Sequence, residues 1–325
     1  MTRTHAIRFD RTGGPEVLEW REVEVGEPGP GEVLLRQTAI GLNYIDTYHR
    51  SGLYPVPLPS GLGQEAAGVV EKAGPGVDLK PGERVAYCMG AVGAYAGLRV
   101  VDARLCVPLP AAIDDRLAAA AMLQGLTAWY LLTETRRVQP GETILFHAAA
   151  GGVGLIACQW AKALGARVIG TVGSRAKAEI ARAHGCDEVI VTSEEDIPTR
   201  VRDLTRGEGV PVVYDSVGKD TFAASLACLR PRGLMVSFGN ASGPVPPVEL
   251  SRLALGGSLF LTRPTLVHYT GSRPELLRAA AALFAELATG RIKVDVRQTF
   301  ALADAAEAHR ALEGRRTVGS TVLIP

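Results

Sequence analysis

The sequence lacks the features of a membrane-spanning, secreted or nucleic-acid-binding protein. No run of about 18 uncharged apolar residues occurs, and the first residues contain no apolar signal-peptide core. Lys and Arg number 35 against 34 Asp and Glu, so a net charge of +1 offers no basic surface to nucleic acid. Aromatic residues make up only 6% of the chain, which gives no support to base stacking. We therefore expect a cytoplasmic protein without a membrane span or a nucleic-acid partner.

Cysteine is also scarce, and its spacing excludes two kinds of site. The five cysteines stand singly along the 325 residues, with no Cys-x-x-Cys pair. This spacing argues against a disulfide framework and against zinc sites built on paired cysteines. The histidines His49 and His147 likewise have no neighbouring Cys or His in the sequence, so we expect them to be structural. The sequence therefore predicts no metal site.

A chain of 325 residues is long for one core, and its pattern changes along its length. The first 125 residues alternate short apolar runs with Gly/Pro turns, which predicts a small barrel or sandwich. The segment Asn43–Gly52 is rich in polar and aromatic groups, and the proline-rich segment Tyr54–Pro59 after it predicts a surface loop. The expected strands are 5–9, 18–23, 32–39, 66–70, 84–88 and 98–101. Two helical stretches follow, at 118–123 and 127–133.

The middle of the chain alternates strands and helices, which predicts a doubly wound parallel sheet of six strands. The expected strands are 143–148, 167–172, 188–192, 211–216, 233–238 and 258–263. The expected helices are 152–164, 175–184, 197–206, 220–229 and 249–255. In the tail we expect helices at 274–289 and 303–313 and strands at 292–300 and 319–324. Such a tail could fold back onto the N-terminal part.

One turn in the middle region has the pattern of a phosphate-binding loop. The apolar strand Ile144–Phe146 leads into small residues, and a helix pattern with an apolar face follows. The spacing is Ala149-x-Gly151-x-x-Gly154, so an alanine replaces the first glycine of the dinucleotide fingerprint. A helix N-terminus at such a turn favours an anion through its unpaired N–H groups and its dipole. The strand before and the helix after the turn favour dinucleotide binding over a bare Gly/Ala-rich turn.

Seven segments make a specific combination: GGPEVL (13–18), GLNYIDTY (41–48), RSGLY (50–54), GLGQEAAG (61–68), HAAAGGVG (147–154), VYDSVG (213–218) and FGN (238–240). With them the chain resembles the medium-chain dehydrogenase/reductase superfamily over its full length. It resembles specifically the zinc-free quinone oxidoreductase branch, which includes the ζ-crystallin-like reductases. The resemblance implies an α/β protein with a GroES-like β-barrel domain at residues 1–125, completed by 268–325. It also implies a Rossmann domain at residues 126–267 and a ligand cleft between the two.

Two departures from the zinc alcohol dehydrogenases of that superfamily bear on the reaction. Asn43 lies where those enzymes have a zinc-binding Cys, and their Gly-His-Glu motif is Gly63-Gln64-Glu65 here. Their lobe of four closely spaced cysteines is missing as well. Without these ligands there is no Lewis acid for alcohol oxidation. A substrate that accepts a hydride or an electron without metal help, such as a quinone or an activated enone, fits better.

The end of the second middle strand predicts the cofactor. An NAD-preferring site places Asp or Glu there to bond the ribose 2′-OH, but the strand ends here in Gly173-Ser174-Arg175. Ser174 can donate a hydrogen bond, and Arg175 and Lys177 offer positive charge to a 2′-phosphate. We therefore predict NADPH. The alternative is that Arg175 and Lys177 only form the solvated start of a helix.

The resemblance also implies individual cofactor contacts. The family often has a tyrosine beside the 2′-phosphate, and Thr192 stands there in this chain, which leaves more of the charge to Lys177. The expected contacts are Asn43, Tyr44, Asp46, Tyr48, Thr127, Ala150, Gly151, Gly152, Val153, Gly173, Ser174, Arg175, Lys177, Thr192, Ser216, Phe238, Gly239, Asn240, Ala241, Thr265, Leu266 and Arg315.

We predict an NADPH-dependent quinone reductase in which Asn43 and Tyr48 are the catalytic candidates. Either side chain could stabilise negative charge that develops on a quinone oxygen, although Tyr48 could equally be a packing residue. One alternative is an enone, alkenal or acyl-CoA reductase of the same superfamily. Another, from a different class, is a non-catalytic NADPH- or RNA-binding protein.

The last strand of the predicted sheet indicates how two copies could associate. The segment Ser258–Thr262 is apolar and would form the edge of the sheet. Exposed apolar edges tend to pair. We therefore expect a homodimer in which two such strands meet.

Overall fold

The computed structural model describes residues 1–325 and divides them into two compact units. The first unit comprises Met1–Leu126, Thr270–Thr289 and Val294–Pro325, and the second comprises Thr127–Tyr269 and Gly290–Lys293. None of the helices is both long enough and apolar enough to cross a membrane.

The second unit is built on six parallel strands in the order β11-β10-β9-β12-β13-β14. This order, with two halves running outward from β9, is that of the dinucleotide-binding fold. It confirms the predicted doubly wound sheet. The strands are β9 (Thr143–Phe146), β10 (Arg167–Val172), β11 (Glu188–Val191), β12 (Val210–Asp215), β13 (Leu229–Ser237) and β14 (Phe260–Thr262).

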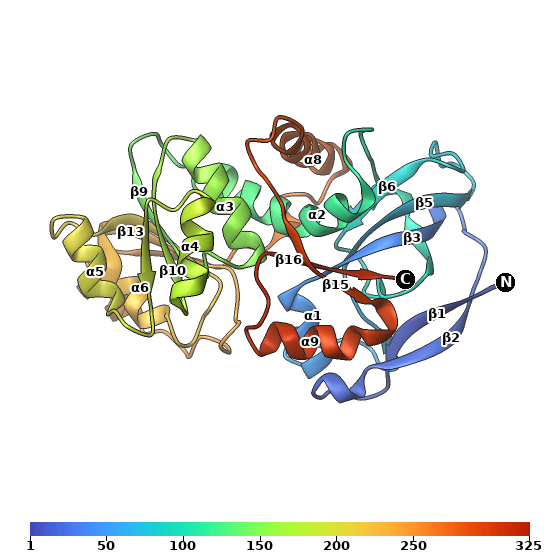
Figure 1. The fold of residues 1–325 in the computed structure, drawn as a ribbon, viewed down its shortest axis with the longest axis horizontal. Helices are drawn as coiled ribbons and strands as arrows, with labels where there is room; N and C mark the ends of the chain where they lie inside the picture. The colour runs from blue at the N-terminus through green and yellow to red at the C-terminus, as the bar shows by residue number, and fades with distance from the viewer. The chain divides into compact units, whose positions relative to one another are not determined.

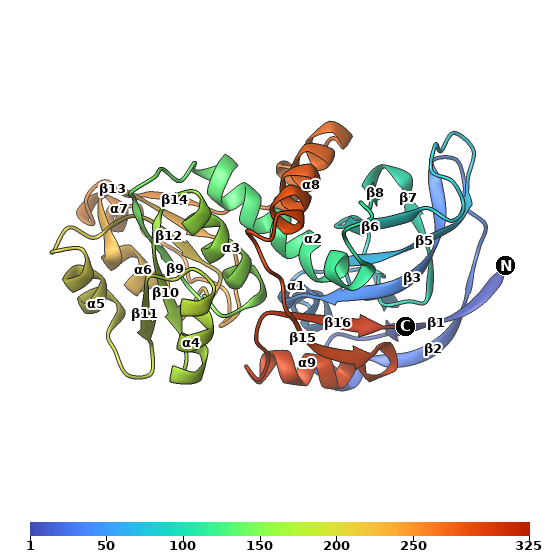
Figure 2. The ribbon, with the colours of Figure 1, turned by 45° about the horizontal axis from the view of Figure 1, so that its top comes forward.

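Helices cover both faces of this sheet, as Figures 1 and 2 show. Helices α3 and α4 lie on one face, and α5 and α6 lie on the other. The apolar core between α5, α6 and the sheet includes Leu145, Ile169, Val213 and Phe222. The central strands are continuous apolar runs because both of their faces are buried. The helices are α3 (Gly152–Ala163), α4 (Arg175–Ala183), α5 (Ile197–Leu204), α6 (Phe222–Cys228) and α7 (Leu250–Leu255).

The first unit contains a seven-stranded sheet and a three-stranded sheet. The larger one has the order β15-β16-β3-β5-β6-β8, with β7 paired to β3, and the smaller one the order β2-β1-β4. The fold is the GroES-like domain that the resemblance implied. The strands before residue 109 are β1 (Thr2–Phe9), β2 (Glu19–Val25), β3 (Glu32–Leu42), β4 (Ser60–Gly61), β5 (Glu65–Ala73), β6 (Arg84–Cys88), β7 (Leu98–Asp102) and β8 (Val107–Pro108).

The C-terminal tail is part of the first unit. Strand β16 (Ser320–Ile324) pairs antiparallel with β3, and β15 (Val296–Ala301) pairs parallel with β16. Helix α8 (Arg273–Ala288) begins at a capping box, in which Ser272 and Glu275 bond each other's backbone N–H groups. Helix α9 (Ala305–Glu313) packs Ala305 and Ala308 into the core of this unit.

Two helices differ from the sequence-based expectation. Helix α1 (Tyr44–Ser51) was not predicted, because its buried face carries polar side chains rather than an apolar stripe. The two helical stretches expected at 118–123 and 127–133 are one helix, α2 (Asp115–Trp129), which continues as a π-helical turn at Tyr130–Thr135. Helix α1 matters most for function because it begins directly after Asn43.

Candidate functional site

The glycine-rich turn of the second unit connects β9 to the N-terminus of α3. Gly151 caps the helix in an extended conformation, and its N–H donates to the Ala148 carbonyl oxygen. A Cβ on Gly154 would lie 2.3 Å from that same oxygen, so only glycine lets the helix start this close to the turn. Ala148 itself has a φ of 52°, a left-handed conformation that costs a residue with a side chain about 1–2 kcal/mol. The turn therefore presents backbone N–H groups at a helix N-terminus, as a phosphate requires.

The structure explains why alanine is tolerated at the first fingerprint position. Ala149 is fully buried, and its N–H donates to the Thr171 carbonyl of β10. The residue beside it on β10 is Gly170, where an added Cβ would lie 2.7 Å from the Ala149 Cβ. Gly170 thus leaves the space that the Ala149 methyl group fills. The missing glycine of the fingerprint is compensated by a glycine on the neighbouring strand.

The turn between β10 and α4 carries no carboxylate. Gly173 faces open space, and Ser174 is the N-cap of α4. Arg175 is exposed and forms an ion pair with Glu194, at 2.8 Å between the guanidinium and carboxylate groups. This pair lowers the pKa of Glu194 and raises that of Arg175, because each charge stabilises the other. Lys177 follows two residues later on the first turn of α4.

The ends of β12 and β13 meet at the same edge of the sheet as the glycine turn, because the strands are parallel. Asp215 organises this end: its carboxylate accepts from the N–H groups of Val217 and Gly218 and from the Thr221 and Ser225 hydroxyls. His147 bonds the Ser225 hydroxyl and that of Thr171, so this buried histidine has a structural role.

The loop after β13 approaches the loop after β12 closely. A Cβ on Gly239 would lie 2.4 Å from the Ser216 carbonyl oxygen, and the Ala241 N–H donates to that oxygen. Arg263, just after β14, donates to the Gly239 carbonyl oxygen at 2.9 Å. Sequence reasoning assigned Arg263 no role. Its only signal was a charged residue directly after an apolar strand.

The remaining predicted residues of the second unit differ in exposure. Thr127 and Leu266 are buried, and Phe238, Asn240 and Ala241 are partly buried. Thr192 is exposed, and its N–H donates to the Val172 carbonyl at the end of β10. Thr265 is also exposed and precedes a short helical turn at Leu266–His268.

In the first unit, Asn43 is held by side chains from three elements. Its Nδ2 donates to Glu65 at the start of β5, and its Oδ1 accepts from Gln124 of α2 at 3.1 Å. Its backbone N–H donates to the carboxylate of Asp46 at 2.9 Å. Only 4% of the Asn43 surface is exposed. These contacts hold the Asn43 side chain in place between the three elements.

The two carboxyl groups around Asn43 are fully buried, and no cation lies among the groups that perturb them. Burial raises the pKa of Asp46 to about 7 and that of Glu65 to about 8, because desolvation disfavours the charged form. Asp46 accepts hydrogen bonds from Asn43 and from the Tyr95 hydroxyl, which lies 2.8 Å away. Asp46 therefore lies behind Asn43, in the interior of the unit.

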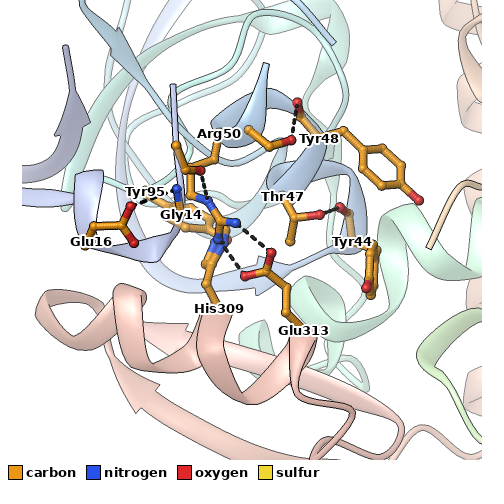
Figure 3. A network of polar contacts seen from close by, with 11 residues as sticks. Gly14, Glu16, Tyr44, Thr47, Tyr48, Arg50, Tyr95, His309 and Glu313 are labelled. Carbon is orange, nitrogen blue, oxygen red and sulfur yellow. Dashed lines mark hydrogen bonds and ion pairs between the residues drawn. The ribbon is translucent and has the colours of Figure 1, made fainter. Parts of the chain in front are cut away.

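Helix α1 is braced against α9 of the tail by a buried arginine (Figure 3). Arg50 is 2% exposed and donates to both carboxylate oxygens of Glu313, at 2.6 and 2.9 Å. It also contacts His309 Nδ1 at 2.8 Å and the Gly13 carbonyl oxygen at 3.1 Å. Burial and the Arg50 charge lower the pKa of His309 to about 3, so this ring is neutral. His309 in turn contacts the Tyr95 hydroxyl, which connects the brace to Asp46.

The aromatic side chains of α1 form a small cluster. The Tyr48 ring packs edge-on against Tyr54, with centroids 5.1 Å apart, and lies 5.7 Å from the ring of Tyr44. Tyr48 is 8% exposed. His49 faces Gln64, at 2.9 Å between His49 Nε2 and Gln64 Nε2. Gln64 therefore bonds a histidine of α1, and no three His, Cys, Asp or Glu side chains gather to hold a metal ion.

Arg315 follows α9 in a left-handed conformation. Its φ is 56°, and its N–H donates to the Leu312 carbonyl oxygen at 3.0 Å. Nearby charges of Glu313 and Arg315 act on the Tyr44 hydroxyl, whose pKa is raised mainly by burial. Both residues belong to the first unit.

Comparison with known proteins gives the family. The family described as "Alcohol dehydrogenase GroES-like domain" matches residues 29–111, and the one described as "Zinc-binding dehydrogenase" matches residues 152–286. The quinone oxidoreductase of Pseudomonas aeruginosa is 57% identical over 98% of this chain and 99% of its own length. The chain belongs to the quinone oxidoreductase branch of the medium-chain dehydrogenases/reductases. Membership in the quinone oxidoreductases confirms the resemblance seen in the sequence.

Two further relatives indicate the range of activities near this chain. The crystal structure of Escherichia coli quinone oxidoreductase complexed with NADPH has a TM-score of 0.98 and 53% identity, and covers 99% of this chain and 100% of that chain. The 2-haloacrylate reductase of a Burkholderia species is 48% identical over 98% of each chain. Quinone oxidoreductases and a 2-haloacrylate reductase are thus similar to this chain at comparable identity.

Proposed function

We propose that this protein reduces quinones with NADPH as the electron donor, without a metal ion. The observation that carries the proposal is the turn after β10, where Gly173 and Ser174 replace the carboxylate of an NAD site and Lys177 adds a positive charge. The quinone oxidoreductases that are more than half identical to the chain support the substrate class. The E. coli relative in complex with NADPH supports the cofactor.

The residues around the glycine turn fit a dinucleotide. We assign the pyrophosphate to the N-terminus of α3, with backbone contacts from Ala150 to Val153. Ser174 and Lys177 bind the 2′-phosphate, whereas Arg175 contributes less because Glu194 already pairs with it. The other proposed contacts are Tyr44, Thr127, Gly173, Thr192, Ser216, Phe238, Gly239, Asn240, Ala241, Thr265, Leu266 and Arg315.

Asn43 and Tyr48 act on the reacting end. Bound NADPH supplies the reducing equivalents. The hydrogen-bonded amide of Asn43 positions a polar group at the nicotinamide or at a quinone oxygen, and the Tyr48 ring bounds the site. Asp46 contributes indirectly, because its carboxylate holds the Asn43 N–H. Water can protonate the quinol oxygen, so no acidic side chain is required.

The cofactor assignment is tested by calorimetric titration of NADPH into matched charge variants. Lys177→Ala should weaken NADPH binding about tenfold or more, since a charged hydrogen bond to a phosphate contributes about 1.5–3 kcal/mol. Arg175→Ala should weaken it less, because Glu194 competes for that guanidinium. Unchanged NADPH affinity in Lys177→Ala would refute the assignment.

A second candidate function is reduction of an activated alkene. The 48% identity to 2-haloacrylate reductase favours it, and a metal-free site suits an electron-poor double bond as well as a quinone. A steady-state panel of 1,4-quinones, 2-haloacrylate and 2-alkenals with NADPH separates the two. We expect the highest kcat/KM for the quinones, and a higher value for 2-haloacrylate would favour the alternative.

We propose that two copies pair through β14. This edge strand exposes Phe260 at 60% and Leu261 at 38%, and α7 beside it in the sequence exposes Leu250 and Leu255. Apolar edge strands of this kind tend to be covered. Sedimentation should give a dimer for the natural chain and a monomer for Phe260→Lys, and a monomeric natural chain would refute the proposal.

We further propose that residues 1–125 with 268–325 form the substrate domain and that 126–267 form the NADPH domain. The location is proposed to be the cytoplasm, where the five buried free cysteines would remain reduced. Fractionation of the source cells would test the location.

A further inference from the structure

A chain of buried polar side chains in the first unit runs from the tail to Asn43. The Ser320 hydroxyl, at the start of β16, lies 2.7 Å from Gln124 Oε1. Gln124 Nε2 lies 3.1 Å from Asn43 Oδ1, and Asn43 Nδ2 bonds Glu65 Oε1. All four side chains are at most 6% exposed. No solvent can therefore bond a mismatched donor or acceptor within this hydrogen-bond chain.

Each end of this chain can reverse its role. The Ser320 hydroxyl has one hydrogen, yet it lies within reach of two acceptors, Gln124 Oε1 and the Ala120 carbonyl oxygen at 2.9 Å. At the other end, Glu65 Oε2 accepts from the Leu123 N–H at 2.6 Å, which leaves Oε1 to bond Asn43. The amides of Asn43 and Gln124 exchange donor and acceptor when they rotate by half a turn.

With Glu65 ionised, the hydrogen bonds run from the tail toward the carboxylate. Ser320 donates to Gln124, Gln124 donates to Asn43, and Asn43 donates to Glu65. With Glu65 protonated, every bond can reverse. Glu65 then donates to Asn43, Asn43 to Gln124, Gln124 to the Ser320 oxygen, and Ser320 to Ala120. In both arrangements each of the four side chains keeps a donor facing an acceptor along this hydrogen-bond chain. The reversal gives up the capping contact of the Asp46 backbone N–H with the Asn43 side chain, but that N–H keeps its bond to the Asn43 carbonyl oxygen.

We propose that Glu65 is a positioning residue whose proton sets the direction of this hydrogen-bond chain, and with it the face that the Asn43 amide presents. A single proton on a side chain of β5 thus decides whether Asn43 turns its oxygen or its nitrogen toward Gln124. The consequence for nicotinamide binding rests on the role of Asn43 in the proposed function. The reversal itself is a property of the first unit alone.

The surroundings of Glu65 keep both protonation states accessible near neutral pH. The titratable groups that face it are Asp46 on α1, Tyr87 and Cys88 on β6, and Tyr95 in the loop that follows β6. None of them is a cation that would hold the carboxylate ionised. Burial accordingly raises the pKa of Glu65 to about 8.

The test is a pH titration of side-chain amide NMR signals in the cofactor-free protein. In the natural chain, the Asn43 and Gln124 signals should shift together with one common midpoint. In Glu65→Gln the new amide can only donate to Asn43 while its oxygen accepts from Leu123, so both signals should stay at their low-pH positions. Independent midpoints, an immobile Gln124 signal, or an unchanged titration in Glu65→Gln would overturn the proposal.

The matched control is Asp46→Asn, which removes the other buried carboxyl group near Asn43. Its amide oxygen can still accept from Asn43 and Tyr95, so the common titration should persist. Loss of the titration in Asp46→Asn would assign the effect to Asp46 and overturn the proposal.

Neutron diffraction of the natural protein at pD values below and above the midpoint needs no variant. Deuterium on Glu65 and reversed amides at the lower pD are expected, and identical amides at both would again overturn the proposal. The NMR and neutron measurements need no NADPH or quinone, so a failure of the proposed function would leave them unaffected.

Kinetics adds the functional readout: the KM for NADPH should depend on pH across the midpoint in the natural protein and should lose that dependence in Glu65→Gln. Equal pH dependence of that KM in both proteins would instead count against the role of Asn43 in the proposed function.

Discussion

The glycine turn of the second unit and the Asn43 cluster of the first unit are built from opposite materials. Residues 148–152 of the turn offer backbone groups and side chains no larger than a methyl group, and close contacts such as Gly154 against Ala148 define its shape. The cluster uses long polar side chains, which bond one another out of contact with water. Steric fit therefore controls the glycine turn, whereas buried charge and hydrogen-bond direction control the Asn43 cluster.

Removing one partner of a buried ion pair should have the largest effect. Glu313→Leu leaves the Arg50 guanidinium buried without its carboxylate, which should lower the free energy of unfolding by about 3 kcal/mol. The matched control is Glu194→Leu in the second unit. The pair of Glu194 with Arg175 is exposed, so its loss should lower the free energy of unfolding by no more than about 0.5 kcal/mol. Urea unfolding of both variants measures the difference. Equal losses would contradict the contrast between the two regions.

A methyl group on β10 tests the steric side of the comparison. In Gly170→Ala the new Cβ would lie 2.7 Å from the Ala149 Cβ and 2.6 Å from the Cys186 sulfur, so we expect a loss of about 2 kcal/mol. Ala149→Gly should restore about 1 kcal/mol of it in the double variant. A double-mutant cycle by urea unfolding gives the coupling energy. Strict additivity of the two changes would show that Gly170 does not compensate for Ala149.

The buried carboxyl groups should make the stability of the protein depend on pH in an unusual direction. The folded state retains protons on Asp46 and Glu65, with pKa values raised to about 7 and about 8, that the unfolded state loses at lower pH. At these two groups the unfolded chain binds fewer protons, so their contribution to the free energy of unfolding falls as the pH rises from about 4 to 8. The buried His309, whose pKa is lowered to about 3, contributes a slope of the opposite sign below its unfolded pKa of about 6.5.

Asp46→Asn isolates one of these two groups. Between pH 4 and about 7 it should remove a falling contribution of up to about 1.4 kcal/mol per pH unit, while the contributions of Glu65 and His309 remain. Urea unfolding across this range measures it. A slope equal to that of the natural chain would mean that Asp46 is ionised in the folded protein.

The smallest expected effect is at the strained residue of the glycine turn. Ala148→Gly should raise the free energy of unfolding by up to about 1 kcal/mol, because glycine accepts a φ of 52° without a steric penalty. Ala150→Gly, two residues on and without a positive φ, should instead lose about 0.5 kcal/mol. Thermal unfolding of both cofactor-free variants provides the test. A loss of stability in Ala148→Gly would show that its conformation carries no strain.

The sequence was sufficient to predict most of the fold, because apolar periodicity reports burial directly. The strand expected at 167–172 coincides with β10, and the helix expected at 303–313 differs from α9 by two residues. Helix α1 was missed because Asp46, His49 and Arg50 fill its buried face, and a polar face gives no apolar period. The tertiary contacts of Arg50 with α9, rather than an apolar face, stabilise helix α1.

Sequence-based prediction of the site succeeded for the glycine turn and missed the partners of Asn43. The glycine turn follows from local spacing, since its residues are neighbours in the sequence. The partners of Asn43 lie 22 residues away at Glu65 and 81 away at Gln124, and only the fold brings them together. A glutamate at the start of an apolar strand was the one available signal for the Glu65 contact. For Ser320 no signal distinguished a buried role from an exposed one, and for Arg263 the only signal was a charge directly after an apolar strand.

The central claim, NADPH-dependent quinone reduction, is tested most directly by kcat/KM for one 1,4-quinone with NADPH and with NADH. Measured on the natural chain at saturating quinone, the ratio should favour NADPH at least about tenfold, since a phosphate–lysine contact of about 1.5–3 kcal/mol is lost with NADH. A ratio near one, a preference for NADH, or no quinone turnover with either cofactor would contradict the account.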